Sequence, residues 1–250
     1  MAFFGTWLGY ILSADAVVLY RTGTSPLLRA RWAFVGVFAI SVPFWWIYEG
    51  LNLITDNWDY APRHWEESAG SALLFSLDFA TVLPGLFVTA ELVRSIKFFG
   101  MPWSGGLVPL AAPALRSIPI VGLAALTAVL MWPHLMYPLV WLVLFLLLDP
   151  VNALAGRPSL FDNLIRGRWD TIVTLSAASP VCGFLWEMWN SRSSLRWIYH
   201  VPGFEDSVHL FQMPLVGYAG YVPFIWSAYA AYHFVRAPLR LPHLRVGADD

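Results

Sequence analysis

Two acid–amide pairs occur at the same spacing in the two halves of the chain. Glu49 and Asn52 stand three residues apart in the segment EGLN, and Glu187 and Asn190 repeat that spacing in EMWN. On a helix this spacing places the carboxyl and the amide on one face, so that the amide can orient the acid. An acid in an apolar setting favours its neutral form and can donate a proton near neutral pH. These four residues are the candidate catalytic residues.

Aromatic side chains gather around both pairs. The candidate substrate-binding residues are Trp45, Trp46 and Trp58 in the first half, and Trp186, Trp189, Trp197 and Tyr199 in the second. Their ring faces can stabilise a desolvated cation by about 2 kcal/mol. Two other interpretations stay open, because tryptophan and tyrosine also form belts at membrane boundaries and an acid near a boundary can simply reach water.

Four further residues are secondary candidates. Asp15 and Asp149 each follow a tryptophan by eight residues. They either act in function or pair structurally with nearby arginines, and Asp149, which precedes Pro150, can also satisfy a broken helix end. Asp78 in FSLDFA has no counterpart in the other half, and we expect it to partner the acid cluster or His209.

The sequence favours neither a metal site nor a bound cofactor. Its six histidines show no HxxxH, HxH or Glu-x-x-His spacing, and Cys182 is the single cysteine, which excludes intrachain disulfides and cysteine-rich metal sites. Glycine-rich phosphate loops and nucleotide-binding fingerprints are absent from the sequence. A role for His233 as a haem or chlorin ligand is less favoured than a structural one.

The composition predicts an all-α, polytopic membrane protein. Hydrophobic residues make up 58% of the 250 positions and charged residues 12%, about half the share in a soluble domain. This excludes a soluble enzyme and a nucleic-acid-binding protein. Since a span needs about 20 apolar residues, we predict seven, at 3–20, 32–54, 70–92, 117–133, 135–155, 170–190 and 207–234.

The basic residues predict the orientation. Twelve of the 15 lie in segments 21–31, 93–116, 156–169 and 235–250, and only Arg63, Arg192 and Arg196 lie elsewhere. Basic residues favour the cytoplasmic side, so the N-terminus is expected outside and the C-terminus inside. We expect residues 1–250 to form a single membrane domain in the lipid bilayer of the bacterial inner (cytoplasmic) membrane.

The chain also carries an internal duplication. Trp7 and Asp15 match Trp141 and Asp149, RARW at 29–32 matches RGRW at 166–169, and WDY at 58–60 matches WIY at 197–199. Residues 3–92 and 135–234 are thus predicted to be equivalent three-helix repeats, with 117–133 as the linker helix. Because equivalent helices are four spans apart, the repeats run parallel, and shared sites form between such halves.

In organisation, the chain resembles the integral-membrane carotenoid cyclases, the heterodimeric or fused lycopene cyclases. The resemblance lies in FWWIYEGLNLITDNWDY at 44–60, FLWEMWNSRSSLRWIYHVPGFED at 184–206 and FQMPLVGY at 211–218. The acids of that family beside the third-helix proline are absent here, since Leu-Val-Gly follows Pro214 and Gly-Leu-Phe follows Pro84.

The resemblance implies a long isoprenoid or carotenoid bound between the halves and proton-initiated, redox-neutral cyclisation. Two alternatives remain at this point. One is a non-catalytic pigment-binding or scaffold subunit that works with other membrane subunits. The other is a small-solute transporter, against which we count the absence of matching glycine or proline breaks at mid-span.

Overall fold

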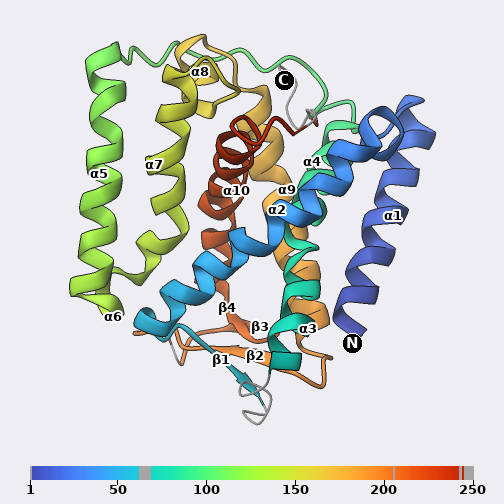
Figure 1. Cartoon of the computed structure of the whole chain (residues 1–250), viewed down its shortest axis with the longest axis vertical. Helices are drawn as coiled ribbons and strands as arrows, with labels where there is room; N and C mark the ends of the chain where they lie inside the picture. Colours follow the sequence, from blue (N-terminus) through green and yellow to red (C-terminus); the bar gives the residue numbers. More distant parts are fainter. Residues whose placement is uncertain (1, 62–68, 205, 242–243, 245–250) are drawn as a thin grey trace.

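The computed structural model describes residues 2–61, 69–204, 206–241 and 244, and it is mostly helical (Figure 1). The chain passes back and forth along the long axis of the molecule. Four short strands gather at the end where the chain begins, which we call the strand end. The loops that join α1 (Ala2–Thr22) to α2, α4 to α5 and α7 to α9 lie at the opposite end.

Six helical segments have the length and apolar composition of a membrane span. They are Phe3–Thr22, Pro26–Thr55, Gly70–Arg94, Ala112–Met131, Pro133–Leu154 and Asp170–Asn190, close to the first six predicted spans. The second begins six residues before the predicted start with a short turn that Ser25 caps, its hydroxyl accepting from the Leu28 N–H. The backbone leaves the helical region at Ala30, so the regular helix begins next to the predicted start.

The third of these segments is interrupted. Helix α3 (Ala69–Phe79) ends before α4 (Val82–Arg94) begins. Ser41 of α2 (Pro26–Thr55) bridges the gap, because its hydroxyl donates to the Phe79 carbonyl and accepts from the Leu83 N–H at 3.0 Å. A side chain of a neighbouring helix thus satisfies backbone groups that the break leaves open.

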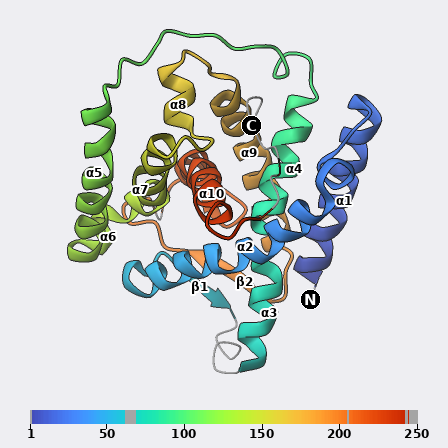
Figure 2. The same ribbon diagram turned by 45° about the horizontal axis from the view of Figure 1, so that its top comes forward.

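The predicted seventh span, 207–234, is wrong in its first half. Residues before Tyr221 form strands β3 (His209–Leu210) and β4 (Met213–Pro214) and the 3-10 helix η3 (Leu215–Gly220). Only α10 (Tyr221–Arg236) is a regular α-helix, and its 16 residues extend about 24 Å, less than a full hydrocarbon thickness. It lies at the centre of the molecule, surrounded by the other helices (Figure 2).

The fourth and fifth segments form a hairpin at the boundary that Trp132-Pro133 predicts. Helix α5 (Ala112–Met131) ends at Trp132, and α6 (Pro133–Met136) and the 3-10 helix η2 (Tyr137–Leu139) lead into α7 (Val140–Leu154). Helix α5 packs mainly on α7 and is otherwise exposed at the edge of the bundle. A Cβ on Gly122 would approach Leu147 to 2.9 Å, so this glycine permits the close packing.

Two segments far apart in the chain meet as strands, which the sequence analysis does not predict. Strand β1 (Trp58–Ala61) follows α2, and β2 (Arg196–Tyr199) follows α9 (Asp170–Asn190). They pair antiparallel, with Trp58 opposite Tyr199 and Tyr60 opposite Trp197. The strand pair therefore joins the ends of the two helices that carry the acid–amide pairs. At the end of the bundle opposite the strands, the short helix α8 (Leu160–Ile165) links α7 to α9 (Figure 1).

Candidate functional site

Glu187 lies near the strand end of α9 and is fully buried. Its Oε1 accepts hydrogen bonds from the Tyr199 hydroxyl at 2.8 Å and the Tyr221 hydroxyl at 2.6 Å. Among the described residues, its Oε2 is buried without a hydrogen-bond partner. A buried, unpartnered oxygen of an anion is costly, so this arrangement suits a neutral acid whose carbonyl oxygen accepts both bonds.

Glu49 lies at the matching position of α2 and is only half-buried. Its Oε1 accepts from the Tyr60 hydroxyl at 2.6 Å and from the Trp45 indole N–H at 2.8 Å. Each acid is thus bound by the tyrosine of the strand that follows its own helix. Burial is the main cause that raises the pKa of the Tyr60 and Tyr199 hydroxyls, and the neighbouring acid raises it further when it is ionised, so both tyrosines stay protonated as donors.

The two amides hold the strands. Asn52 donates to the Trp58 carbonyl at 2.7 Å and accepts from the Trp58 N–H at 3.1 Å. Asn190 donates to the Trp197 carbonyl at 2.9 Å and accepts from the Trp197 N–H at 3.0 Å. We predicted that the amides orient the acids. Asn190 does interact with Glu187 through its side chain, and both amides also fix the strands whose tyrosines reach the acids.

A large aromatic cavity of about 360 Å³, which we call the second cavity, opens beside the Tyr199–Glu187 pair. Tyr199 and Tyr221 belong to its wall, whereas Glu187 lies behind them. The volume is within the range of small-molecule sites. The other large aromatic side chains in its wall include Trp45, Tyr137, Trp141, Trp186, Phe204 and Phe224.

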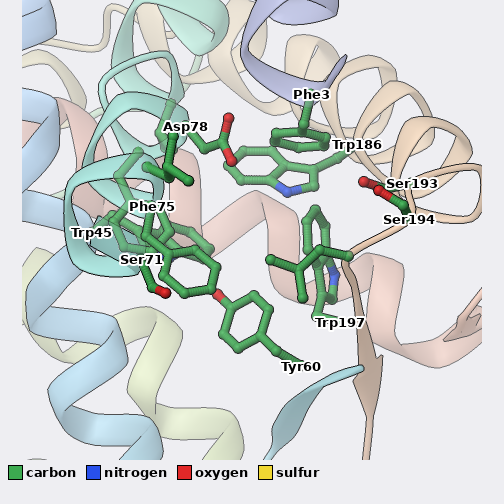
Figure 3. Close-up of a pocket in the computed structure, with 14 residues that line it drawn as sticks. Phe3, Trp45, Tyr60, Ser71, Phe75, Asp78, Trp186, Ser193, Ser194 and Trp197 are labelled. Atoms are coloured by element: carbon green, nitrogen blue, oxygen red, sulfur yellow. The ribbon is translucent and has the colours of Figure 1, made fainter. Parts of the chain in front are cut away.

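A smaller cavity of about 130 Å³, the first cavity, lies beside the Tyr60–Glu49 pair (Figure 3). Seven of its lining rings follow one another in contact, and we call them the aromatic chain: Phe3, Trp197, Trp186, Trp45, Phe79, Phe75 and Tyr60. Trp45 and Trp186 line both cavities, with ring centroids 5.3 Å apart. Each acid therefore lies beside a different cavity. The two cavities are neighbours that share these two tryptophans, and the acids do not face one common pocket.

Three of the predicted substrate-binding tryptophans are not among the residues that line either cavity. Trp46 is 39% exposed, and its indole N–H donates to Ser76. Trp58 stacks on Trp141, with ring centroids 6.0 Å apart, and Trp189 packs edge-on against Trp7 at 4.9 Å. Trp45, Trp186, Trp197 and Tyr199 do line a cavity.

Tyr60 and Tyr221 are partners of the acids that we did not predict from the sequence. Tyr60 could have been found, because it matches Tyr199 in the duplicated Trp-x-Tyr element. Nothing in the sequence marks Tyr221, which reaches Glu187 from the start of α10.

Asp15 and Asp149 perform the same structural task, one at the start of α2 and the other at the start of α8. Asp15 accepts from the Ser25 hydroxyl at 2.7 Å and from the Leu27 N–H at 3.0 Å. Asp149 accepts from the Ser159 hydroxyl at 2.6 Å and from the backbone N–H groups of Leu160 and Phe161. Both aspartates hold the start of the following helix. These bonds replace the predicted pairing with arginines.

Asp78 lines the first cavity, whereas His209 does not approach it. Among the described residues, the neighbours of Asp78 do not include His209. His209 is exposed in β3, and its Nδ1 lies 2.7 Å from the Ser207 carbonyl oxygen. The expected partnership of the two residues is therefore wrong.

Within the described part of the chain, no three His, Cys, Asp or Glu side chains come together as a metal site would require. The chain was also compared with protein-family models, with curated proteins and with solved structures. None of the three comparisons finds a match.

Proposed function

We propose that the chain crosses the bacterial cytoplasmic membrane seven times, as two homologous three-helix halves joined by α5, with its N-terminus outside. In support, one set of contacts occurs twice: aspartate to serine at the start of a helix, amide to strand backbone, and tyrosine to glutamate. Helix α10, preceded by η3, would make the seventh crossing. Binding sites in such repeat proteins lie where the two halves meet. Both cavities have lining residues from each of the proposed halves.

We further propose that the second cavity binds the end of a long, apolar, unsaturated ligand of the isoprenoid or carotenoid class. One observation carries this proposal. A fully buried acid, Glu187, stands directly behind two tyrosines in the wall of an aromatic cavity. Aromatic walls bind an apolar chain, and the acid behind them gives the site a chemical role.

The chemistry proposed for this site is redox-neutral cyclisation. The neutral acid would supply a proton through the hydroxyl of Tyr199 or Tyr221 in the cavity wall to a terminal carbon–carbon double bond, which leaves a tertiary carbocation on the ligand, and the proton lost later would return by the same route. Attack of a second double bond closes the ring, and loss of a neighbouring proton to the carboxylate restores the acid. Ligand and product are isomers. The faces of Trp45, Trp186 and Phe224 would stabilise the cation.

The experiment compares two matched variants in turnover of an acyclic carotenoid. Glu187→Gln keeps the shape but removes the proton, so turnover should fall by about two to four orders of magnitude. Glu49→Gln is the control, because its tyrosine lines the other cavity. Thermal unfolding of both variants checks the fold.

The outcomes separate the proposed roles. Normal turnover in Glu187→Gln would refute the acid role. Binding of the carotenoid without turnover in the unaltered protein would favour a pigment-binding subunit. Absence of any bound polyene would contradict the proposal as a whole.

Transport of a small solute is a second candidate, and the break in the third span favours it. The regular helix is interrupted at Ala80–Thr81 in the first half, and η3 precedes α10 at the corresponding place in the second. Broken helices in matching positions mark the binding sites of many transporters. Solute uptake into liposomes that contain only this protein would support this candidate over the enzyme.

A further inference from the structure

The first cavity has a wall that suits a small cation. The seven rings of the aromatic chain surround it from six elements, namely the helices α1, α2, α3 and α9 and the strands β1 and β2 (Figure 3). Ring faces carry negative potential, and a cation within about 6 Å of them is attracted even where water is excluded. The volume of 130 Å³ is close to that of an engineered apolar protein cavity of ~150 Å³ that binds benzene. A ligand group of about six heavy atoms would therefore fill this cavity.

Asp78 supplies the complementary charge. It is the one charged side chain among the described lining residues, and Figure 3 shows its carboxylate directed toward Phe3 and Trp186. The backbone N–H of Phe4 also donates a hydrogen bond to this carboxylate. The other polar lining groups include the hydroxyl-bearing residues Ser71, Ser193 and Ser194.

We infer that the first cavity binds a methylated ammonium group, held by the aromatic chain and by Asp78. Methylated ammonium ions are weakly hydrated and bind in aromatic cages. A calcium or magnesium ion would need six or more oxygen ligands, which an aromatic wall lacks. An anion would be repelled by Asp78. This site is separate from the second cavity and does not depend on the function proposed there.

The experiment measures binding by calorimetry on the full chain in a maltoside detergent, which has no ammonium group. Choline and tetramethylammonium are the probes. The control ligand is the neutral analogue of choline in which a carbon atom replaces the nitrogen. We expect choline to bind about tenfold more tightly than the neutral analogue. Equal binding of the two, or no binding of choline, would overturn the inference.

Variants locate the binding to this cavity. Asp78→Asn should weaken choline binding about tenfold and leave the neutral analogue unchanged. Asp162→Asn is the matched control, because Asp162 lies in α8, pairs with Arg166 and lines neither cavity, and this variant should bind choline normally. Unaltered choline affinity in Asp78→Asn would contradict the inference. If Asp78→Asn does not fold, the comparison of the two ligands on the unaltered protein decides alone.

The ammonium group could belong to a free solute or to a lipid headgroup, and two nanodisc preparations distinguish these sources. One contains phosphatidylcholine and the other phosphatidylglycerol. If the cavity takes the headgroup, choline affinity should fall in phosphatidylcholine discs only. If it takes a free solute, affinity should be the same in both. Loss of choline binding in both preparations would count against the site.

Discussion

Asp149 and Glu187 are both fully buried acids, and their hydrogen bonds distinguish their roles. Asp149 accepts one hydroxyl and two backbone N–H groups, so both of its oxygens are satisfied. Glu187 takes two tyrosine hydroxyls on one oxygen and leaves the other without a partner among the described residues. The first pattern is that of a helix cap and the second that of a group with spare hydrogen-bonding capacity.

Replacement of Asp149 tests the capping role. In Asp149→Ala the Ser159 hydroxyl and two N–H groups lose their acceptor, and each such group costs about 1–3 kcal/mol when buried. We expect a clear fall in the thermal unfolding temperature in detergent. Asp15→Ala should cause a smaller fall, because Asp15 holds one hydroxyl and one N–H. The exposed Asp206→Ala serves as the control. An unchanged unfolding temperature in Asp149→Ala would refute the role.

At the scale of elements, the β1–β2 pair is the feature that brings the ends of α2 and α9 together. Asn52 and Asn190 extend from the helix ends and hold the backbone of one tryptophan in each strand. The register then sets each tryptophan opposite the tyrosine of the other strand. The positions of both acids relative to the cavities therefore depend on this pairing.

A disulfide tests the register. Ala61 and Arg196 are direct partners across the pair, so Ala61→Cys with Arg196→Cys should form a disulfide under mild oxidation, in a Cys182→Ala background. Intact mass spectrometry would detect the loss of two hydrogens. The control is Ala61→Cys with Ile198→Cys, which lies two residues out of register. Equal cross-linking of the two pairs would contradict the antiparallel register.

Elements differ in how far the sequence predicts them. The first six spans are visible as apolar runs, and the duplicated Trp-x-Tyr element marks both strand tyrosines. The strand pairing is not visible, because it joins segments more than 130 residues apart and each strand has four residues. The break before α4 lies four residues ahead of Pro84, which has no N–H for the Ala80 carbonyl, whereas the role of Ser41 of another helix in satisfying it is not visible in the sequence. Residues 207–220 are apolar enough to imitate part of a span.

In the whole molecule, the basic residues are distributed unequally between the two ends of the helix bundle. The described basic residues of segments 21–31, 93–116, 156–169 and 235–250 belong to the end opposite the strands, where the connecting loops lie (Figure 1). Arg192 and Arg196 belong to the strand end, whereas Arg63 and Arg245 lie outside the described residues. Basic residues are retained on the cytoplasmic side, so both cavities should open toward the outer boundary of the membrane.

Accessibility of introduced cysteines tests this orientation. Arg196 at the strand end and Arg166 at the opposite end are both exposed, so each substitution to cysteine should leave the fold intact. In intact cells with Cys182→Ala as background, a membrane-impermeant maleimide should label Arg196→Cys and spare Arg166→Cys. Permeabilised cells provide the control, since both should then react. The reverse pattern would invert the orientation. Labelling of both in intact cells would place the two ends of the bundle on one side of the membrane. That result would contradict the proposal that the helices cross the membrane between these ends.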